Sequence, residues 1–364
     1  MERSSKLACL IAAGGTAGHV RPALAVAEAL RARGVTVTFA GSPDRVESRL
    51  VPEAGFELDT FSVSGLPRNV SLDLVRALVR AVRAPFACRR ILTLRRPDVV
   101  LGAGGYVAGP MVLAARVRGI PAALTEADAH LGLANRLAAP LARSVFLSYA
   151  IAGRDGAKYR VVGRPIPSAH LGASRDAGRA RFGLPAGGPV LAVFGGLAGA
   201  QALNEFAVET YGGQGPAILH VSGERDYEAL RPKVARPDYV LLPTTDHFGE
   251  ALAVADLAIS RAGGTVWELA AAGTPAILVP YPYATSDHQH LNARHFEQGG
   301  GAVVVGQADL ARVPELVAEL LADAARLRRM SDAMRTLARP DAADAIADEL
   351  VRLARERRRG DEAK

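Results

Sequence analysis

Short apolar runs alternate with longer amphipathic stretches along most of this chain of 364 residues. Short apolar runs bounded by turn residues predict buried strands, and apolar positions spaced three or four apart predict helices. In the first half we predict strands at 7–13, 36–40, 99–101, 122–124 and 144–147, and helices at 22–33, 72–84 and 108–118. In the second half we predict strands at 190–194, 217–221, 239–242, 257–259, 276–279 and 302–305, separated by helices such as 200–210.

This alternation is typical of α/β proteins with parallel, doubly wound sheets. A proline-rich joint at 162–167 separates two such blocks, so we predict two Rossmann-like domains facing a cleft. The predicted N-terminal domain covers 1–163 and the C-terminal domain 164–341. The amphipathic segment 342–364 is predicted to form a last helix that packs back on the N-terminal domain.

Composition narrows the class of protein. The only cysteines, Cys9 and Cys88, form no CxxC pair, which argues against a disulfide framework or a structural zinc site and fits a reducing cytosol. No apolar run approaches the roughly 20 residues that span a bilayer, and 7–13 reads as a buried strand rather than a signal peptide. We therefore expect a soluble or peripheral protein.

A formal net charge of +7 points to nucleic acid, an anionic membrane or an anionic substrate. Much of that charge lies in 72–96, where seven arginines stand against one acid. Arginine beside apolar residues favours an anionic membrane surface over a merely solvated face, and the lack of an aromatic platform makes nucleic acid the weaker alternative. The predicted membrane face comprises Arg76, Leu78, Val79, Arg80, Val82, Arg83 and Phe86.

A glycine turn follows the first predicted strand and ends in His19 at the start of a helix. The turn is not GxGxxG, and no acid closes the second strand, so a dinucleotide site is weakly supported. Glycines alone would suit a tight turn, but a histidine at a positive helix end is favoured in its neutral form and can act as a base. The turn residues are Gly14, Gly15, Thr16 and Gly18.

Two further polar groups follow strand ends in the first half. Gly104, Gly105 and Tyr106 form a second glycine turn, which suits close approach of a pyrophosphate or tight packing on a neighbouring strand. Glu126 and Asp128 follow a later strand, with Asn135 on the next helix. Carboxylates at this edge of a sheet are candidates for a general base or for binding an acceptor hydroxyl, although Asp128 alone also fits a helix cap.

The segment 260–293 carries the strongest signal. A strand ends in a glycine turn, a helix opens at Thr265, and Glu268 stands in its first turn. The bare N–H groups and positive dipole of such a helix suit a phosphate, and the carboxylate can accept hydrogen bonds from a ribose diol. Asp287, Gln289 and Asn292 suit sugar hydroxyls. Together these groups predict a nucleotide-sugar site.

Five motifs occur in order: GGTAGHVRPALAVAEAL, GAGGYVAGP, TEADAHLGLANRLAAP, FGGLAGAQALN and SRAGGTVWELAAAGTPAILVPYPYATSDHQHLNA. Over about residues 7–310 they resemble the bacterial UDP-N-acetylglucosamine–N-acetylmuramyl-(pentapeptide) pyrophosphoryl-undecaprenol N-acetylglucosaminyltransferases, the MurG family. The resemblance implies the GT-B glycosyltransferase architecture. It implies inverting transfer of GlcNAc from UDP-GlcNAc to the 4-hydroxyl of MurNAc in undecaprenyl-pyrophosphoryl-MurNAc-pentapeptide, which converts lipid I to lipid II in peptidoglycan synthesis.

The resemblance also assigns site residues. It places the base at His19 or Glu126 without choosing between them. The implied donor residues are Gly195, Gly196, Gly199, Ala200, Phe248 near the uracil, Arg261, Gly263, Gly264, Thr265, Glu268 on the ribose, Asp287, Gln289 and Asn292. The implied acceptor residues are Gly14, Gly15, Thr16, Gly18, Gly104, Gly105, Tyr106, Asp128 and Asn135.

No obligatory metal or other cofactor is implied. The implied partners are UDP-GlcNAc, the lipid-linked MurNAc-pentapeptide, the anionic cytoplasmic face of the plasma membrane and other cell-wall synthesis proteins, with no nucleic acid. The sequence departs from the family at Thr125, Ala127, Asp128, Leu197, Ala198 and the joint 163–167, and its donor turn is one residue short. Alternatives are a natural-product glycosyltransferase or UDP-GlcNAc 2-epimerase of the same fold, and a catalytically silent membrane-associated relative.

Overall fold

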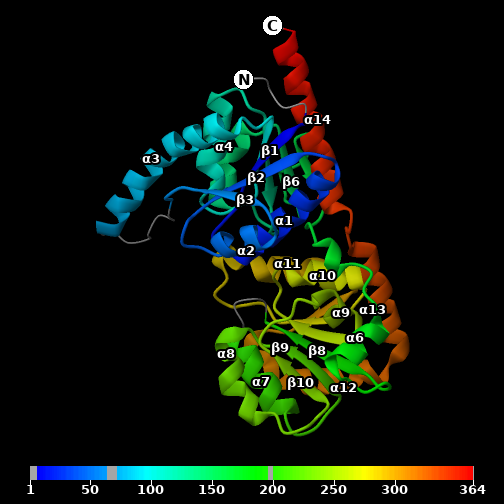
Figure 1. The fold of residues 1–364 in the computed structure, drawn as a ribbon. Coiled ribbons are helices and arrows are strands. Elements are labelled where there is room, and N and C mark those ends of the chain that lie inside the picture. Colours follow the sequence, from blue (N-terminus) through cyan, green and yellow to red (C-terminus); the bar gives the residue numbers. More distant parts are fainter. Residues whose placement is uncertain (1–5, 64–71, 196–199, 364) are drawn as a thin grey trace. The chain divides into compact units, whose positions relative to one another are not determined.

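The computed structural model describes residues 6–63, 72–195 and 200–363, with the backbone alone for 72–82 and for Thr285. The chain divides into two compact units (Figure 1). The first unit comprises Met1–Pro167 together with Asp341–Lys364, and the second comprises Ser168–Pro340. Each unit is built on a parallel β-sheet flanked by helices, which confirms the predicted fold class. No helix in the described parts of the chain is both long and apolar enough to cross a membrane.

The first unit has a seven-stranded sheet in the order β3-β2-β1-β4-β5-β6-β7. Its strands are β1 (Ala8–Ala12), β2 (Thr36–Gly41), β3 (Glu57–Thr60), β4 (Val99–Gly102), β5 (Ala122–Glu126), β6 (Ser144–Leu147) and β7 (Tyr159–Val161). Its helices are α1 (Ala17–Ala32), α2 (Glu47–Glu53), α3 (Leu72–Arg95), α4 (Ala108–Val117), α5 (Leu133–Ala138), η1 (Ala139–Leu141) and α14 (Ala342–Glu362).

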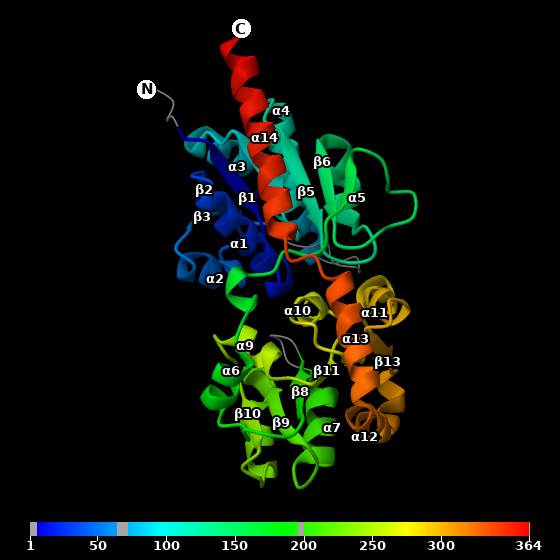
Figure 2. The same cartoon turned by 90° about the vertical axis from the view of Figure 1, so that its right-hand side faces the viewer.

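Two layers of helices bury the faces of this sheet. On one face, α1 and α14 pack together over β1 and β4, with Val26, Leu30, Ile346 and Leu350 fully buried. Figure 2 shows α14 lying along this sheet. On the other face, α3, α4 and α5 cover the sheet through a second apolar cluster. The end of the chain thereby completes the core of the first unit.

The second unit has a six-stranded sheet in the order β10-β9-β8-β11-β12-β13. Its strands are β8 (Val190–Phe194), β9 (Ala217–Val221), β10 (Tyr239–Leu242), β11 (Leu257–Ser260), β12 (Ala276–Leu278) and β13 (Ala302–Val304). Its α-helices are α6 (Arg175–Phe182), α7 (Gln201–Tyr211), α8 (Glu224–Leu230), α9 (Phe248–Ala253), α10 (Thr265–Ala272), α11 (His288–Gln298), α12 (Val313–Ala322) and α13 (Ala324–Leu337). Its short 3₁₀ turns are η2 (Ser168–His170), η3 (Arg231–Lys233), η4 (Thr285–Asp287) and η5 (Gln307–Arg312).

The strand order reverses once in each sheet. In the first sheet the chain runs outward from β1 to β3 and then returns to place β4 beside β1. In the second sheet it runs from β8 to β10 and returns to place β11 beside β8. At such switch points the two connections leave in opposite directions, and the crevice outside the carboxyl ends of the strands is where α/β sheets bind ligands.

Two helices differ from their predicted bounds because proline does not end them. Helix α1 begins at Ala17 and contains Pro22, where we predicted the start. Helix α3 continues through Pro85 to Arg95, eleven residues beyond the predicted end at 84. Proline removes one hydrogen bond from a helix, and burial of the helix can offset that loss. In α3 the buried Cys88 and Leu92 lie beyond the proline and anchor the last turns to the sheet. The pattern did not predict α2, β3 or β7.

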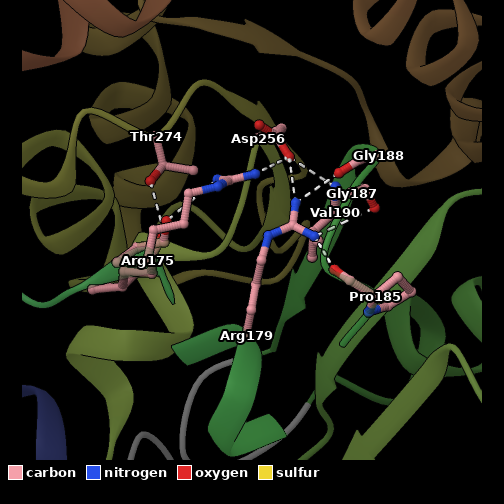
Figure 3. Close-up of polar contacts among 10 residues, drawn as sticks. Arg175, Arg179, Pro185, Gly187, Gly188, Val190, Asp256 and Thr274 are labelled. Carbon is pink, nitrogen blue, oxygen red and sulfur yellow. Dashed lines mark hydrogen bonds and ion pairs between the residues drawn. The ribbon is translucent and has the colours of Figure 1, made fainter. Parts of the chain in front are cut away.

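A buried arginine joins the amino ends of the two central strands of the second sheet (Figure 3). Arg179 of α6 donates to the carbonyls of Pro185, Gly187 and Gly188 and lies 4.0 Å from Asp256. The Asp256 carboxylate in turn accepts the Val190 N–H at 2.8 Å. This cluster lies at the end of the sheet opposite to the glycine turns, so its role is to hold together the amino ends of β8 and β11.

We predict that Arg179→Ala lowers the free energy of unfolding by about 2–3 kcal/mol, because it leaves the carbonyls of Pro185, Gly187 and Gly188 without the guanidinium that donates to them. Urea denaturation measures this change. Arg181→Ala on the same helix is the matched control, since the half-exposed Arg181–Glu250 pair should contribute about 1 kcal/mol or less. Equal losses of unfolding free energy in the two variants would show that the Arg179 cluster contributes no more to stability than an exposed ion pair.

Candidate active site

The two predicted glycine turns of the first unit meet at its switch point. One follows β1 and the other follows β4, and these strands are neighbours in the sheet. A Cβ added at Gly105 would lie 2.2 Å from the carbonyl oxygen of Gly14, and one added at Gly104 would lie 2.4 Å from Nδ1 of His19. Glycine is therefore required at 104 and 105 so that the turns can touch. The structure thus brings His19 and both turns into one place.

A buried carboxylate holds the first turn. Glu47, at the start of α2, is fully buried. It accepts the Gly15 N–H at 3.0 Å and the Ser42 N–H at 2.9 Å. The Gly15 N–H is thus already bound within the protein, whereas the first N–H groups of α1, at Ala17 and Gly18, have no intrahelical partner. An anion at this turn would meet the helix end rather than Gly15.

Glu126 is held by four hydrogen bonds among the described residues. It closes β5, is 6% exposed, and accepts the N–H groups of Ala127, Asp128 and Gly132. Its fourth donor is the Asn135 side chain, at 2.9 Å. Burial raises the pKa of this carboxyl, an effect larger than the lowering by its hydrogen bonds to Asn135 and Gly132. A carboxylate offers about four lone-pair sites, and the four hydrogen bonds that hold the loop after β5 occupy them.

Arg164 links the first turn to this loop. Its guanidinium donates to the Gly18 carbonyl and to the Ala127 carbonyl. The Gly18 carbonyl lies four residues before Pro22, which has no N–H to bond it, so the arginine supplies the missing donor. Arg164 is 8% exposed. It lines a small open pocket with Gly18, His19, Thr125, Glu126, Ser148 and other residues of this unit.

The remaining predicted acceptor residues lie around this place. Thr16 is exposed at the start of α1, Asp128 is half-buried on the loop after β5, and Tyr106 is 60% exposed after the second turn. Asn135 is buried and also donates to the carbonyl of Thr125. Within the described residues, no group of three or more His, Cys, Asp and Glu side chains gathers as a metal site would require.

In the second unit the predicted donor turn follows β11 at the switch point. Gly263 and Gly264 precede α10, which begins at Thr265 as predicted. A Cβ added at Gly263 would meet no described atom within 4 Å, so packing does not require glycine there and space remains for a ligand. Asn292 is buried and donates to the Ala262 carbonyl at 3.1 Å, which fixes α11 to this turn.

Arg261 braces the same turn from inside. Its guanidinium donates to the carbonyls of Val279 and Pro280 at 3.1 and 3.3 Å, and to the Gln307 side chain at 2.6 Å. Burial lowers its pKa. The described contacts of Arg261 are thus with the chain after β12 and with η5, which gives the residue a structural role beside the predicted ligand role.

Glu268 has a partner that the sequence did not indicate. Its Oε1 lies 2.6 Å from Nδ1 of His170, on the turn η2. The His170 ring packs against Phe248, which is the first residue of α9. Phe248 also packs edge to face on Phe194 at the end of β8. The predicted ribose and uracil residues are therefore joined through His170.

The other predicted donor residues are distributed around the carboxyl edge of this sheet. Gln289 accepts the N–H of Tyr281 at 2.9 Å, and Asp287, with φ at 54°, lies 2.6 Å from Nδ1 of His290. Ala200 caps α7 after β8, on the other side of the switch point. Gly195 follows β8 directly, while Gly196 and Gly199, with Leu197 and Ala198, lie outside the described residues.

Part of the predicted membrane face is described. Arg83 and Phe86 are exposed on α3, and the side chains of Arg76, Leu78, Val79, Arg80 and Val82 lie outside the described residues. Large exposed apolar side chains are also present farther along α3, on α4, which packs beside α3, and on α5, which packs beside α4. These exposed residues are Leu94 on α3, Leu113 and Val117 on α4, and Leu133 and Leu137 on α5.

Glu47, Arg164 and His170 are site residues that we did not predict. Each is joined to a partner distant in sequence, which a local pattern does not reveal. Pro22 was the one available signal for Arg164, because a proline early in a helix leaves a carbonyl that needs another donor.

Two family models match this chain. The glycosyltransferase family 28 N-terminal domain matches residues 9–147, and the C-terminal domain of the same family matches residues 190–346. Each match covers one of the two switch points.

Named relatives match nearly the whole chain. It is 43% identical over 354 residues to the UDP-N-acetylglucosamine–N-acetylmuramyl-(pentapeptide) pyrophosphoryl-undecaprenol N-acetylglucosamine transferase of Acidithiobacillus ferrooxidans, covering 95% of this chain and 97% of that protein. It is 39% identical over 347 residues to the protein of the same name from Halothermothrix orenii, covering 90% and 94%. The crystal structure of Acinetobacter baumannii MurG superposes with a TM-score of 0.76 at 30% identity, covering 95% of this chain and 99% of that one.

We predict a pH dependence of stability from Glu126. Because burial raises the pKa of this carboxyl, the folded protein keeps its proton over a pH interval in which the unfolded chain has released it. The free energy of unfolding should therefore fall as pH rises from the ordinary carboxyl range through the raised pKa. Urea denaturation at successive pH values should show this fall in the wild type, and Glu126→Gln should lack that part of the slope. The exposed Glu53→Gln variant is the control, and curves that stay parallel for wild type and Glu126→Gln would contradict the assignment.

Proposed function

This chain belongs to glycosyltransferase family 28 and, within it, to the UDP-N-acetylglucosamine–N-acetylmuramyl-(pentapeptide) pyrophosphoryl-undecaprenol N-acetylglucosamine transferases, and we propose that it carries out the reaction for which they are named. It is an enzyme of peptidoglycan synthesis whose substrates are UDP-GlcNAc and the lipid-linked MurNAc-pentapeptide. The observation that carries this function is 39–43% identity over at least 90% of the chain. The two alternatives of the same fold, a natural-product glycosyltransferase and an epimerase, have no comparable support.

We assign donor binding to the second unit. The switch point between β8 and β11 offers the first turns of α7 and α10, whose N–H groups and dipoles suit a diphosphate. Glu268 in the first turn of α10 would accept hydrogen bonds from the ribose hydroxyls, and Phe248 would lie close to the uracil ring. Gln289 and Asp287 would face the sugar. As UDP leaves, the helix ends stabilise the charge that grows on its phosphates.

We assign acceptor binding to the first unit, with His19 as the base. The acceptor 4-hydroxyl attacks the anomeric carbon while His19 takes its proton, and the configuration inverts. The hydrogen bonding of Glu126 argues against that residue as the base and so favours His19. Glu126 already accepts four hydrogen bonds, so it serves to shape the loop beside His19. Arg164 holds that loop against the first turn and adds positive charge beside the pyrophosphate.

We propose that the reaction needs no obligatory metal. Helix ends at the carboxyl edge of each sheet supply positive potential where the substrates carry phosphate. The proton passes to a histidine, so no metal-bound water is required. Transfer that continues at full rate in a chelator is the corresponding expectation.

We propose that α3, α4 and α5 form the surface that meets the membrane. Phe86, Val117 and Leu137 are each more than 70% exposed, one on each helix. Arg89, Arg90, Arg116 and Arg136 are exposed on the same helices. Exposed apolar side chains ringed by arginine fit the headgroup region of an anionic bilayer on its cytoplasmic side. The surface would hold the enzyme where its lipid-linked acceptor lies, and other cell-wall synthesis proteins could share it.

The function predicts that UDP is released from UDP-GlcNAc only when a polyprenyl-pyrophosphoryl-MurNAc-pentapeptide is added, with a disaccharide-bearing lipid as product. A coupled assay for UDP and mass spectrometry of the lipid measure this, and a chelator should change the rate less than twofold. His19→Ala should lower kcat by about 10²–10⁴-fold, as expected for loss of a general base, with little change in the KM for UDP-GlcNAc.

Exposed Arg143→Ala in the same unit is the control for that variant. UDP-GlcNAc binding without acceptor-dependent release would contradict the proposed transfer. A His19→Ala variant that keeps the wild-type rate would transfer the role of base to another residue.

The membrane proposal predicts that the protein co-sediments with phosphatidylglycerol vesicles and only weakly with neutral phosphatidylcholine vesicles. Replacing Phe86 and Leu137 together by aspartate should lower the vesicle partition coefficient by at least about tenfold, because apolar area no longer enters the bilayer and negative charge is repelled. Val161→Asp changes an exposed apolar residue of β7 and is the matched control. Equal partitioning of the double variant and the wild type would contradict the proposal.

A further inference from the structure

We infer that His170 is a positioning residue of the donor site, which orients the Glu268 carboxylate toward the ribose of UDP-GlcNAc. The inference rests on the proposed function, because it takes the ribose as the ligand of Glu268. It adds a residue outside the five motifs that carried the resemblance.

The contact between the two residues is short and shielded from solvent. Nδ1 of His170 lies 2.6 Å from Oε1 of Glu268, and the two side chains are 8% and 15% exposed. A carboxylate accepts hydrogen bonds, so we assign the proton of this bond to Nδ1. Among the described contacts this bond occupies Oε1 alone, so Oε2 is available to accept from the ribose hydroxyls. The carboxylate therefore has one favoured orientation before any ligand binds.

Packing fixes His170 as firmly as the hydrogen bond does. Its ring centroid lies 5.3 Å from that of Phe248, and Phe248 packs edge to face on Phe194 at 5.1 Å. A Cβ added at Gly249 would lie 2.7 Å from the carbonyl oxygen of Ala169 and 2.9 Å from Cα of His170, so α9 and η2 are in close contact. The hydrogen bond and the packing against Phe248 together hold the ring beside Glu268.

The position of the pair indicates why the bond matters for the nucleoside. Glu268 stands in the first turn of α10, after β11, and Phe194 closes β8, so the pair lies beside the switch point of this sheet. His170 joins the residue proposed for the ribose to the one proposed for the uracil. A ligand that donates both ribose hydroxyls to Glu268 meets an acceptor whose orientation is already set, and this lowers the entropic cost of binding.

The test uses the full-length enzyme and three substitutions at one position. His170→Phe keeps a ring against Phe248 and removes the hydrogen bond. His170→Asn places an amide N–H where Nδ1 was, whereas His170→Gln places it near the former Nε2. His170→Phe should raise the Kd and the KM for UDP-GlcNAc about tenfold with kcat changed less than threefold, and His170→Asn should stay within threefold of wild type while His170→Gln does not. His247→Phe, an exposed histidine of the same unit, is the matched control.

A second ligand separates positioning from a general structural role. UDP-GlcNAc analogues that lack the 2′- or 3′-hydroxyl of the ribose should bind the wild type more weakly, and for at least one of them His170→Phe should cause no further loss. Calorimetric titration gives these Kd values, and the melting temperature of each variant reports on folding. If His170→Phe does not fold, the difference between His170→Asn and His170→Gln carries the test.

Three results would overturn the inference. The first is wild-type affinity for UDP-GlcNAc in His170→Phe or, where that variant does not fold, in His170→Gln. The second is an equal loss for the deoxy analogues, which would show that His170 acts elsewhere. The third is a wild type indifferent to the ribose hydroxyls, which removes the role of Glu268. Failure of the proposed function looks different, since the wild type would then bind UDP-GlcNAc without transferring GlcNAc or would not bind it.

Discussion

Parallel strands impose the constraint on which the rest of this structure depends. Each connection between parallel strands must cross over the sheet, so a sheet that grows in both directions from its first strand has one place where the connections part. In the first unit that place lies between β1 and β4, and in the second between β8 and β11. A glycine turn and a helix start follow these strands at each place. Both units thus carry the same arrangement of turn and helix start, which suits a phosphate-bearing substrate.

The crowding of such a place must be resolved by polar side chains from elsewhere. Where two turns touch through Gly105 and Gly14, their backbone groups point in directions that regular structure cannot satisfy. Glu47 accepts a hydrogen bond from the N–H of Gly15, and Arg164 donates one to the Gly18 carbonyl, which Pro22 leaves unbonded. Buried polar groups without partners are costly, so these contacts are conditions for the turn geometry as much as for binding. The hydrogen bonds that stabilise these turns are therefore also the ones that set the geometry proposed for ligand binding.

Sequence patterns could predict the strands and the turns because these are local. The strand at 190–194 and the glycine turn at 263–264 can each be recognised from a few consecutive residues. The order of such elements along the chain predicted the fold that the comparisons show. Helix ends were less predictable, since Pro22 and Pro85 lie inside helices. Arg164 donates to the carbonyl that Pro22 leaves unbonded, and burial of the turns beyond Pro85 offsets the bond lost there. The hydrogen bonds of Glu47 and Arg164 to the first turn could not be predicted, because Glu47 lies 32 residues from Gly15 and Arg164 lies 146 residues from Gly18.

The same distinction bears on which carboxylates act on substrate. Glu126 and Glu268 both follow strand ends and looked alike in the sequence, yet their surroundings differ. Glu126 receives four donors from its own loop, so its oxygens are engaged before any ligand arrives. Glu268 receives one described donor, from His170, and keeps an oxygen for a hydroxyl. A carboxylate held on one side is prepared for binding, whereas one held on every side is part of the framework. This criterion favours His19 over Glu126 as the proton acceptor that we propose for the first unit.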